Sequence, residues 1–124
     1  MSSNNITFFC FLLAIVFFQS INGMIIGECK EPNQWKSWLN VHRPNLIGEF
    51  ELVPHYQKIF AGQSFVCLKP PALEVLTADN REPSTTGDTF RFTFTEGFLC
   101  LNQIIKPKKK ACTDYKIKFC CPAS

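Results

Sequence analysis

Alternation of apolar and polar side chains is clearest in the second half of the chain. Every second residue between positions 90 and 95 is phenylalanine, and lysines alternate with apolar residues between positions 115 and 119. A period of two is the pattern of a strand with one buried face. Glu96-Gly97 is typical of a tight turn, and the apolar run after it predicts a returning strand. The pattern therefore predicts antiparallel β structure.

The rest of the chain predicts shorter elements. Residues 55–61 have apolar side chains at helical spacing, so we expect a short helix there, ended by Gly62. Residues 64–68 and 72–77 are apolar runs of strand length, and residues 78–88 have the composition of a loop. The fold class expected is mainly β, an antiparallel sandwich-like domain with one or two short helical turns.

The most apolar segment lies at the N-terminus. Residues 6–18 contain one polar residue, Thr7. They are too short for a bilayer span of ~20 residues but have the length of a signal-peptide core, ~7–15 residues. Ser20 and Gly23 supply small residues for cleavage. We therefore expect residues 1–23 to be a signal peptide and residues 24–124 to be a single secreted, extracellular domain.

Charge and length narrow the class of protein. All 13 Lys/Arg and all ten Asp/Glu follow Gly23, so the net charge of +3 belongs to the predicted mature domain. This charge is too mild to argue for a nucleic-acid partner. A domain of 124 − 23 = 101 residues also excludes multidomain and large α/β enzymes.

Six cysteines follow the predicted leader, and an even number in a small secreted chain predicts three disulfides. Neighbouring side chains of a strand point to opposite faces, so Cys120 and Cys121 are expected to bond to different partners. Cys100 and Cys112 flank a polar loop expected to be a hairpin, and we expect a bridge across it. The first two cysteines then pair with the last two, in either order. The six positions are Cys29, Cys67, Cys100, Cys112, Cys120 and Cys121.

The sequence contains no recognisable catalytic motif. It has no GxSxG, no HExxH and no glycine-rich phosphate loop. Oxidised cysteines would also leave no thiol for a Cys–His pair. We therefore expect a protein that is not an enzyme and has no catalytic residues.

Two polar clusters are candidate binding sites. Oxygen-rich side chains close to one another in the sequence can hold Ca²⁺, and a group of this kind lies between residues 40 and 51; the alternative is a solvated strand face and a turn. Four lysines around Pro107 are candidates for binding sulfated or sialylated glycans; the alternative is a solvated hairpin tip. The candidate calcium ligands are Asn40, His42, Glu49 and Glu51, and the candidate glycan-binding residues are Lys106, Lys108, Lys109 and Lys110.

The segment Trp35-Lys36-Ser37-Trp38 is the most specific short motif. A spacing of three places both indoles on one face of a helical turn, so we expect a turn or short helix there. WxxW is also an acceptor pattern for C-mannosylation of its first tryptophan, which makes Trp35 and Trp38 a candidate modification site. The structural alternative, compatible with the first, is two buried indoles.

These motifs together resemble the WxxW domain family, the cysteine-rich module of gel-forming mucins and of cartilage intermediate layer protein. The resemblance rests on the WxxW motif, the acidic segment 48–51, Cys67-Leu68-Lys69-Pro70, TEGFLC and the closing YKIKFCC, and covers residues 29–121. It implies a compact β module of secreted matrix or mucus proteins, without enzymatic activity. Such modules make weak contacts, so the partners expected are extracellular glycoproteins, sulfated glycans or a second copy, without stable membrane insertion.

The resemblance also implies a calcium ion near the acidic segment, as in several members of the family. Asn40, His42 and Glu49 stand where the mucin modules have aspartates, and histidine in place of aspartate removes an oxygen ligand. Val75 and Phe92 stand at two mucin cysteine positions, so an apolar contact between them is expected to replace a disulfide. The functional alternative is a secreted cysteine-rich defence or toxin-like polypeptide, against which the low net charge and the lack of an amphipathic basic helix argue.

Overall fold

The computed structural model of the protein describes residues 23–105 and 108–123. Residues 1–22 of the expected signal peptide and Lys106 lie outside the described residues. Within the described part of the chain, no helix has the length and apolar character needed to cross a membrane.

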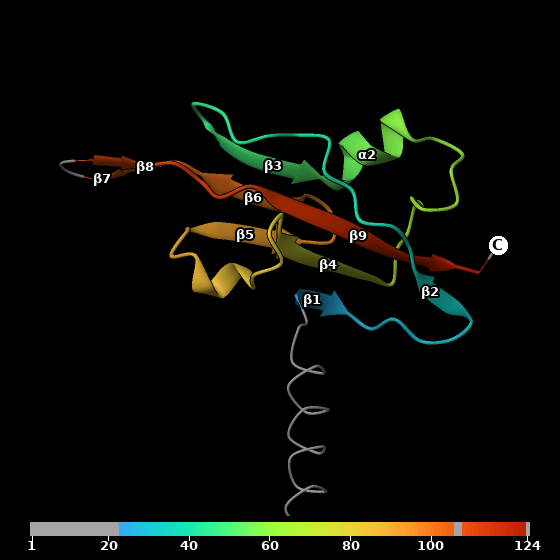
Figure 1. Cartoon of the computed structure of the whole chain (residues 1–124). Helices are drawn as coiled ribbons and strands as arrows, with labels where there is room; N and C mark the ends of the chain where they lie inside the picture. Colours follow the sequence, from blue (N-terminus) through green and yellow to red (C-terminus); the bar gives the residue numbers. More distant parts are fainter. Residues whose placement is uncertain (1–22, 106–107, 124) are drawn as a thin grey trace, which may run out of the picture.

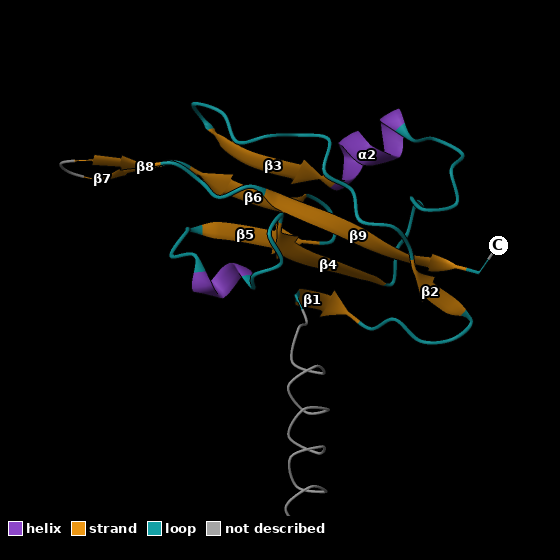
Figure 2. Cartoon of the chain, viewed as in Figure 1, coloured by secondary structure: helices purple, strands orange, loops and turns teal. Residues whose placement is uncertain are grey.

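Two antiparallel sheets form the body of the described chain (Figures 1 and 2). The first sheet has the order β1 (Met24–Gly27), β4 (Ala72–Thr77), β9 (Tyr115–Pro122) and β2 (Asn33–Trp35). The second has the order β3 (Gly48–Leu52), β6 (Gly97–Leu101) and β5 (Phe90–Thr93). The helical elements are α2 (Val53–Ile59) and the 3₁₀ helix η1 (Pro83–Thr85). The expected mainly β fold with short helical turns is confirmed.

The expected hairpin between Cys100 and Cys112 is also present. Strands β7 (Gln103–Ile105) and β8 (Lys108–Lys110) pair antiparallel. Figure 1 shows this hairpin projecting from one end of the molecule, opposite the end that carries the C-terminus.

The apolar core lies between the sheets, and its centre is β9. Tyr115, Ile117 and Phe119 are fully buried, while the lysines between them lie on the other face of the strand. Phe98 of β6 packs against Tyr115, with 4.3 Å between the ring centroids. Val75 belongs to the same core, and Phe92 packs against the core cluster as a whole. The period-two pattern therefore located the core face, while direct contact between Val75 and Phe92 stays a prediction.

Three disulfides join distant parts of the chain to β9 or to the segment before it. The pairs are Cys29–Cys120, Cys67–Cys121 and Cys100–Cys112. Adjacent Cys120 and Cys121 bond to different partners, as expected, and the structure selects one of the two orders left open. The Cys100–Cys112 bridge joins β6 of one sheet to the segment that leads into β9 of the other.

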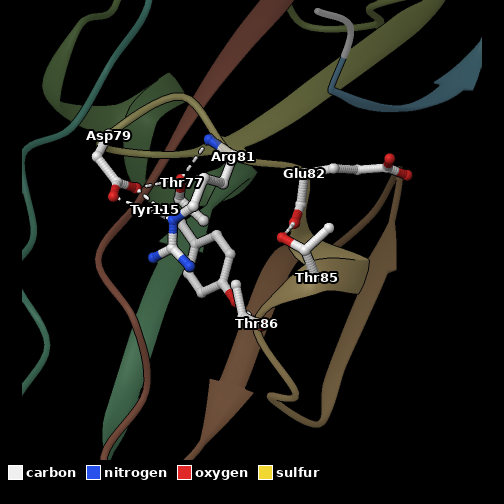
Figure 3. A network of polar contacts seen from close by, with 7 residues as sticks. All are labelled: Thr77, Asp79, Arg81, Glu82, Thr85, Thr86 and Tyr115. Atoms are coloured by element: carbon white, nitrogen blue, oxygen red, sulfur yellow. Dashed lines mark hydrogen bonds and ion pairs between the residues drawn. The ribbon is translucent and has the colours of Figure 1, made fainter.

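The loop after β4 holds the beginning of β9 in place (Figure 3). Thr77 Oγ1 donates to Asp79 at 2.6 Å and accepts from the backbone N–H of Arg81 at 2.6 Å. The hydroxyl groups of Thr86 and Tyr115 lie 2.9 Å apart. The backbone N–H of Ala78 donates to the carbonyl of Asp114 at 2.8 Å. These bonds set the position of residue 114 beside the second sheet.

One sequence-based expectation about secondary structure is wrong, and another is confirmed with shifted bounds. Residues 64–68 form turns instead of a strand. The carbonyls of Cys67 and Leu68 accept from the Gln57 side chain, which takes the place of a neighbouring strand. The helix expected at residues 55–61 begins earlier, at Val53, because Pro54 occupies its first turn, where proline is favoured.

The WxxW segment is not a helical turn either. Trp35 lies opposite Cys120 and Leu39 lies opposite Ile117, so four steps on this segment match three on β9. One extra residue in such a pair shifts the alternation of side chains. The two indoles therefore share a face although the backbone between them is not helical. Lys118 Nζ lies 5.2 Å from the Trp35 ring centroid and 4.6 Å from that of Trp38.

Candidate divalent-cation site

A cluster of carboxylates lies where the two sheets meet. Glu49 and Glu51 are two residues apart on β3, so their side chains leave the same face of the strand. Asp114 directly precedes β9. One oxygen from each of these three carboxylates lies within 4.8 Å of the others. Asn40 joins them, because its Nδ2 donates to both Asp114 oxygens at 3.2 Å.

Both glutamates are fully buried, with 0% of each exposed. The alternative of a solvated strand face is therefore wrong for Glu49 and Glu51. The strand pairs with β6, which places Glu49 opposite Cys100 and Glu51 opposite Phe98, both in the core. A carboxylate in such surroundings is costly unless it has a partner.

Several oxygens of the cluster have no such partner among the described residues. Both oxygens of Glu49, Oε1 of Glu51 and Oδ1 of Asn40 are buried without a hydrogen-bond donor. Buried polar atoms are almost always paired in folded proteins. The other Glu51 oxygen accepts from the Tyr56 hydroxyl, which in turn accepts from the backbone N–H of Val41 at 3.1 Å. The unpaired oxygens therefore point to a missing positive group.

Calcium fits this set of donors. Ca²⁺ takes six to eight oxygen ligands from carboxylates and amide carbonyls in flexible geometry. Asn40, Glu49, Glu51 and Asp114 supply only oxygens for this purpose, and no sulfur or imidazole ligand is required. An ion held by them would join β3 of one sheet to the residue before β9 of the other. Such an ion would neutralise carboxylates that otherwise repel one another.

The structure changes the expected ligand set in two positions. His42 packs against His55, with 4.6 Å between the ring centroids. Asp114 is the candidate ligand that sequence reasoning missed, because it lies 63 residues after Glu51 and the fold alone brings them together. Its carboxylate supplies the hard oxygen donor that the histidine at position 42 lacks.

Burial raises the pKa of Glu49 to about 7 and that of Glu51 to about 10. Neighbouring carboxylates contribute to the raised pKa of Glu51, since one negative charge disfavours a second one nearby. Burial also raises the pKa of Tyr56, and the Glu51 carboxylate adds to this shift. Without an ion the cluster therefore holds protons at neutral pH, and bound Ca²⁺ would have to displace them.

We expect the ion-free protein to lose stability as the pH rises. An acid with a raised pKa in the folded state binds more protons folded than unfolded above its ordinary pKa of 4.5. The contribution of these carboxyl groups to the free energy of unfolding is then greatest below pH 4.5 and decreases as the pH rises through 7. Urea unfolding in a chelator should show a loss of about 1 kcal/mol or more between pH 5 and pH 8. Stability that rises over this range would contradict the raised pKa values.

The other candidate sites are the tryptophan pair and the four lysines around Pro107. Trp35 and Trp38 share Lys118 on the outer face of the first sheet, where Lys118 Nζ also pairs with Glu74 at 3.3 Å. Both indoles are half-buried, so the interpretation as two buried indoles is wrong, and C-mannosylation of Trp35 stays a prediction. Lys106 lies outside the described residues, and so do the side chains of Lys108, Lys109 and Lys110.

Comparison with known proteins gives one family. The family model described as the mucin-2 protein WxxW repeating region matches residues 35–121. Cartilage intermediate layer protein 2 of Homo sapiens is 37% identical over 97 residues, which is 78% of this chain. Cartilage intermediate layer protein 1 is 31% identical in Mus musculus and 30% identical in Homo sapiens, over 93 residues and 75% of this chain. The alignments span about 8% of the length of these relatives.

Proposed function

The chain belongs to the WxxW family of mucin-2 and the cartilage intermediate layer proteins, and on this premise we propose that it is a secreted, non-enzymatic module that binds extracellular partners. The family membership makes it a domain of the extracellular matrix type. The observation that carries the proposal is the buried carboxylate cluster, because it suits a structural ion rather than a substrate.

The position of the cluster supports a structural role for the ion. Glu49 and Glu51 have no exposed surface, so a substrate has no access to them. The residues proposed to hold Ca²⁺ are Asn40, Glu49, Glu51 and Asp114. When bound, the ion would supply fixed positive charge between the two sheets. Calcium sites of extracellular modules typically have dissociation constants of roughly 10⁻⁴–10⁻³ M, which suits an extracellular protein.

The partners proposed are sulfated glycans or glycoproteins that meet the basic hairpin. Lys108–Lys110 form strand β8, and Figure 1 shows that the β7–β8 hairpin stands out from the body of the domain. A basic cluster attracts anionic chains in a salt-dependent way. A single module of this kind offers one hairpin, so cross-linking of a gel would need self-association or a bivalent partner.

Replacement of Lys108, Lys109 and Lys110 by alanine is expected to abolish retention on a heparin column at about 0.15 M salt, a condition chosen for its ~8 Å screening length. The matched control replaces Lys30, Lys58 and Lys69, which are exposed and lie outside the hairpin. Both variants lose three positive charges, but the control should keep most of the wild-type retention. Equal loss in the two variants would show that only net charge matters. Failure of the wild-type protein to bind would contradict the glycan proposal.

A further inference from the structure

We propose that Arg43 sets the affinity of the cation site, because its guanidinium neutralises Asp114 in the ion-free protein and competes with the ion. The inference rests on the proposed function, since it concerns the same carboxylates. It assigns to Arg43 the part of an internal counter-cation and not that of a ligand.

The contacts of Asp114 show the competition. Arg43 Nη1 lies 2.9 Å from Asp114 Oδ2, which is an ion pair with a hydrogen bond. Glu49, in contrast, has no donor on either oxygen within the described part of the chain. The positive charge of Arg43 thus lies beside Asp114, the partly exposed carboxylate of the cluster. A divalent ion that binds all three carboxylates has to share Asp114 with Arg43 or displace it.

The Arg43 guanidinium can move away from Asp114 into solvent. Its side chain is 76% exposed, whereas that of Asp114 is 24% exposed. An exposed ion pair contributes little to stability, so the guanidinium returns to water at small cost. The field of Arg43 also reaches the buried part of the cluster, where it acts on the carboxyl of Glu49.

Asp114 keeps its place without Arg43. The Asn40 amide donates to both of its carboxylate oxygens at 3.2 Å, and the backbone N–H of Ala78 holds its carbonyl at 2.8 Å. Removal of Arg43 therefore removes a competing charge without removing the support of the ligand. Tighter binding of the ion follows. If Arg43 instead positioned Asp114, the same change would weaken binding, so the two roles predict opposite signs.

The test is calorimetric titration of Ca²⁺ into the wild-type protein and three variants. Arg43→Gln should bind Ca²⁺ about three- to tenfold more tightly at low salt, and the gain should shrink at high salt as screening increases. Arg43→Lys keeps the charge and should stay close to wild type. Arg91→Gln is the matched control, because the Arg91 side chain is 64% exposed and pairs at 2.7 Å with Glu96, a carboxylate outside the proposed cation site. It should change the affinity less than about twofold, since its ion pair involves no proposed ligand.

The outcomes separate the two proposals. Calcium binding that Arg43→Gln leaves unchanged or weakens would overturn the role of Arg43 and leave the cation site standing. A gain of equal size in Arg43→Gln and Arg91→Gln would also overturn it, because the effect would then be one of net charge. No calcium uptake by the folded wild-type protein would overturn the cation site and the inference together.

Discussion

Saturating Ca²⁺ is expected to raise the free energy of unfolding by about 2.7 kcal/mol at a concentration 100 times the dissociation constant. For a domain of this size, that corresponds to an increase of about 10 °C or more in the unfolding midpoint. The physical reason is that the folded state gathers Glu49, Glu51 and Asp114 within 4.8 Å, whereas the unfolded chain scatters them. Thermal unfolding followed by circular dichroism, with and without a chelator, measures the shift.

Magnesium is the control for this experiment. Mg²⁺ demands near-ideal octahedral geometry and gives up its water reluctantly, so a buried cluster of carboxylates suits it less than Ca²⁺. We expect a clearly smaller shift with Mg²⁺ at the same concentration. A midpoint that does not respond to Ca²⁺ at millimolar concentration would contradict the structural ion.

The double variant Glu49→Gln, Glu51→Gln is expected to gain stability without the ion and to lose the response to Ca²⁺. Both glutamates are fully buried, and three of their four oxygens have no partner among the described residues. A neutral amide of the same shape removes the cost of the buried Glu49 charge, because pH 8 lies above the raised pKa of Glu49, about 7. The gain at pH 8 in a chelator should be about 2 kcal/mol, within the range for unpaired buried polar groups. Urea unfolding of the two proteins measures it.

Glu74→Gln is the matched control. Glu74 is also buried, at 6% exposed, but its carboxylate has a charged partner, Lys118 Nζ at 3.3 Å. Its replacement should lower stability, because Lys118 loses its ion pair, and should leave the response to Ca²⁺ intact. A double variant that is less stable than wild type in the absence of the ion would argue that the carboxylates support the fold on their own.

Much of the fold could be predicted because local patterns carry it. The alternation around Phe92 and Ile117 reports one buried face per strand, and both residues lie in or against the core as expected. The adjacency of Cys120 and Cys121 predicted that they bond to different partners, because neighbouring side chains of a strand point to opposite faces. The order of these two pairs came from the structure alone. These features depend on neighbours in the sequence, so the sequence alone reveals them.

The site could be predicted only in part, because it depends on contacts far apart in the chain. Sequence spacing located Glu49 and Glu51 but did not predict their burial. The strand that pairs with theirs follows only after position 96. Asp114 had no local signal at all. The shared face of Trp35 and Trp38 depends on one extra residue opposite β9, which only the pairing with that strand shows.

The most direct test of the proposed cation site is to measure the number of calcium ions bound per chain by equilibrium dialysis. Wild-type protein should bind one Ca²⁺ per chain at millimolar concentration, the range expected for extracellular modules. The double variant Glu49→Gln, Glu51→Gln and the single variant Asp114→Asn should each bind much less, while Glu74→Gln should bind as wild type does. A folded wild-type protein without bound calcium, or calcium that the double variant retains in full, would contradict a site built from Glu49, Glu51 and Asp114.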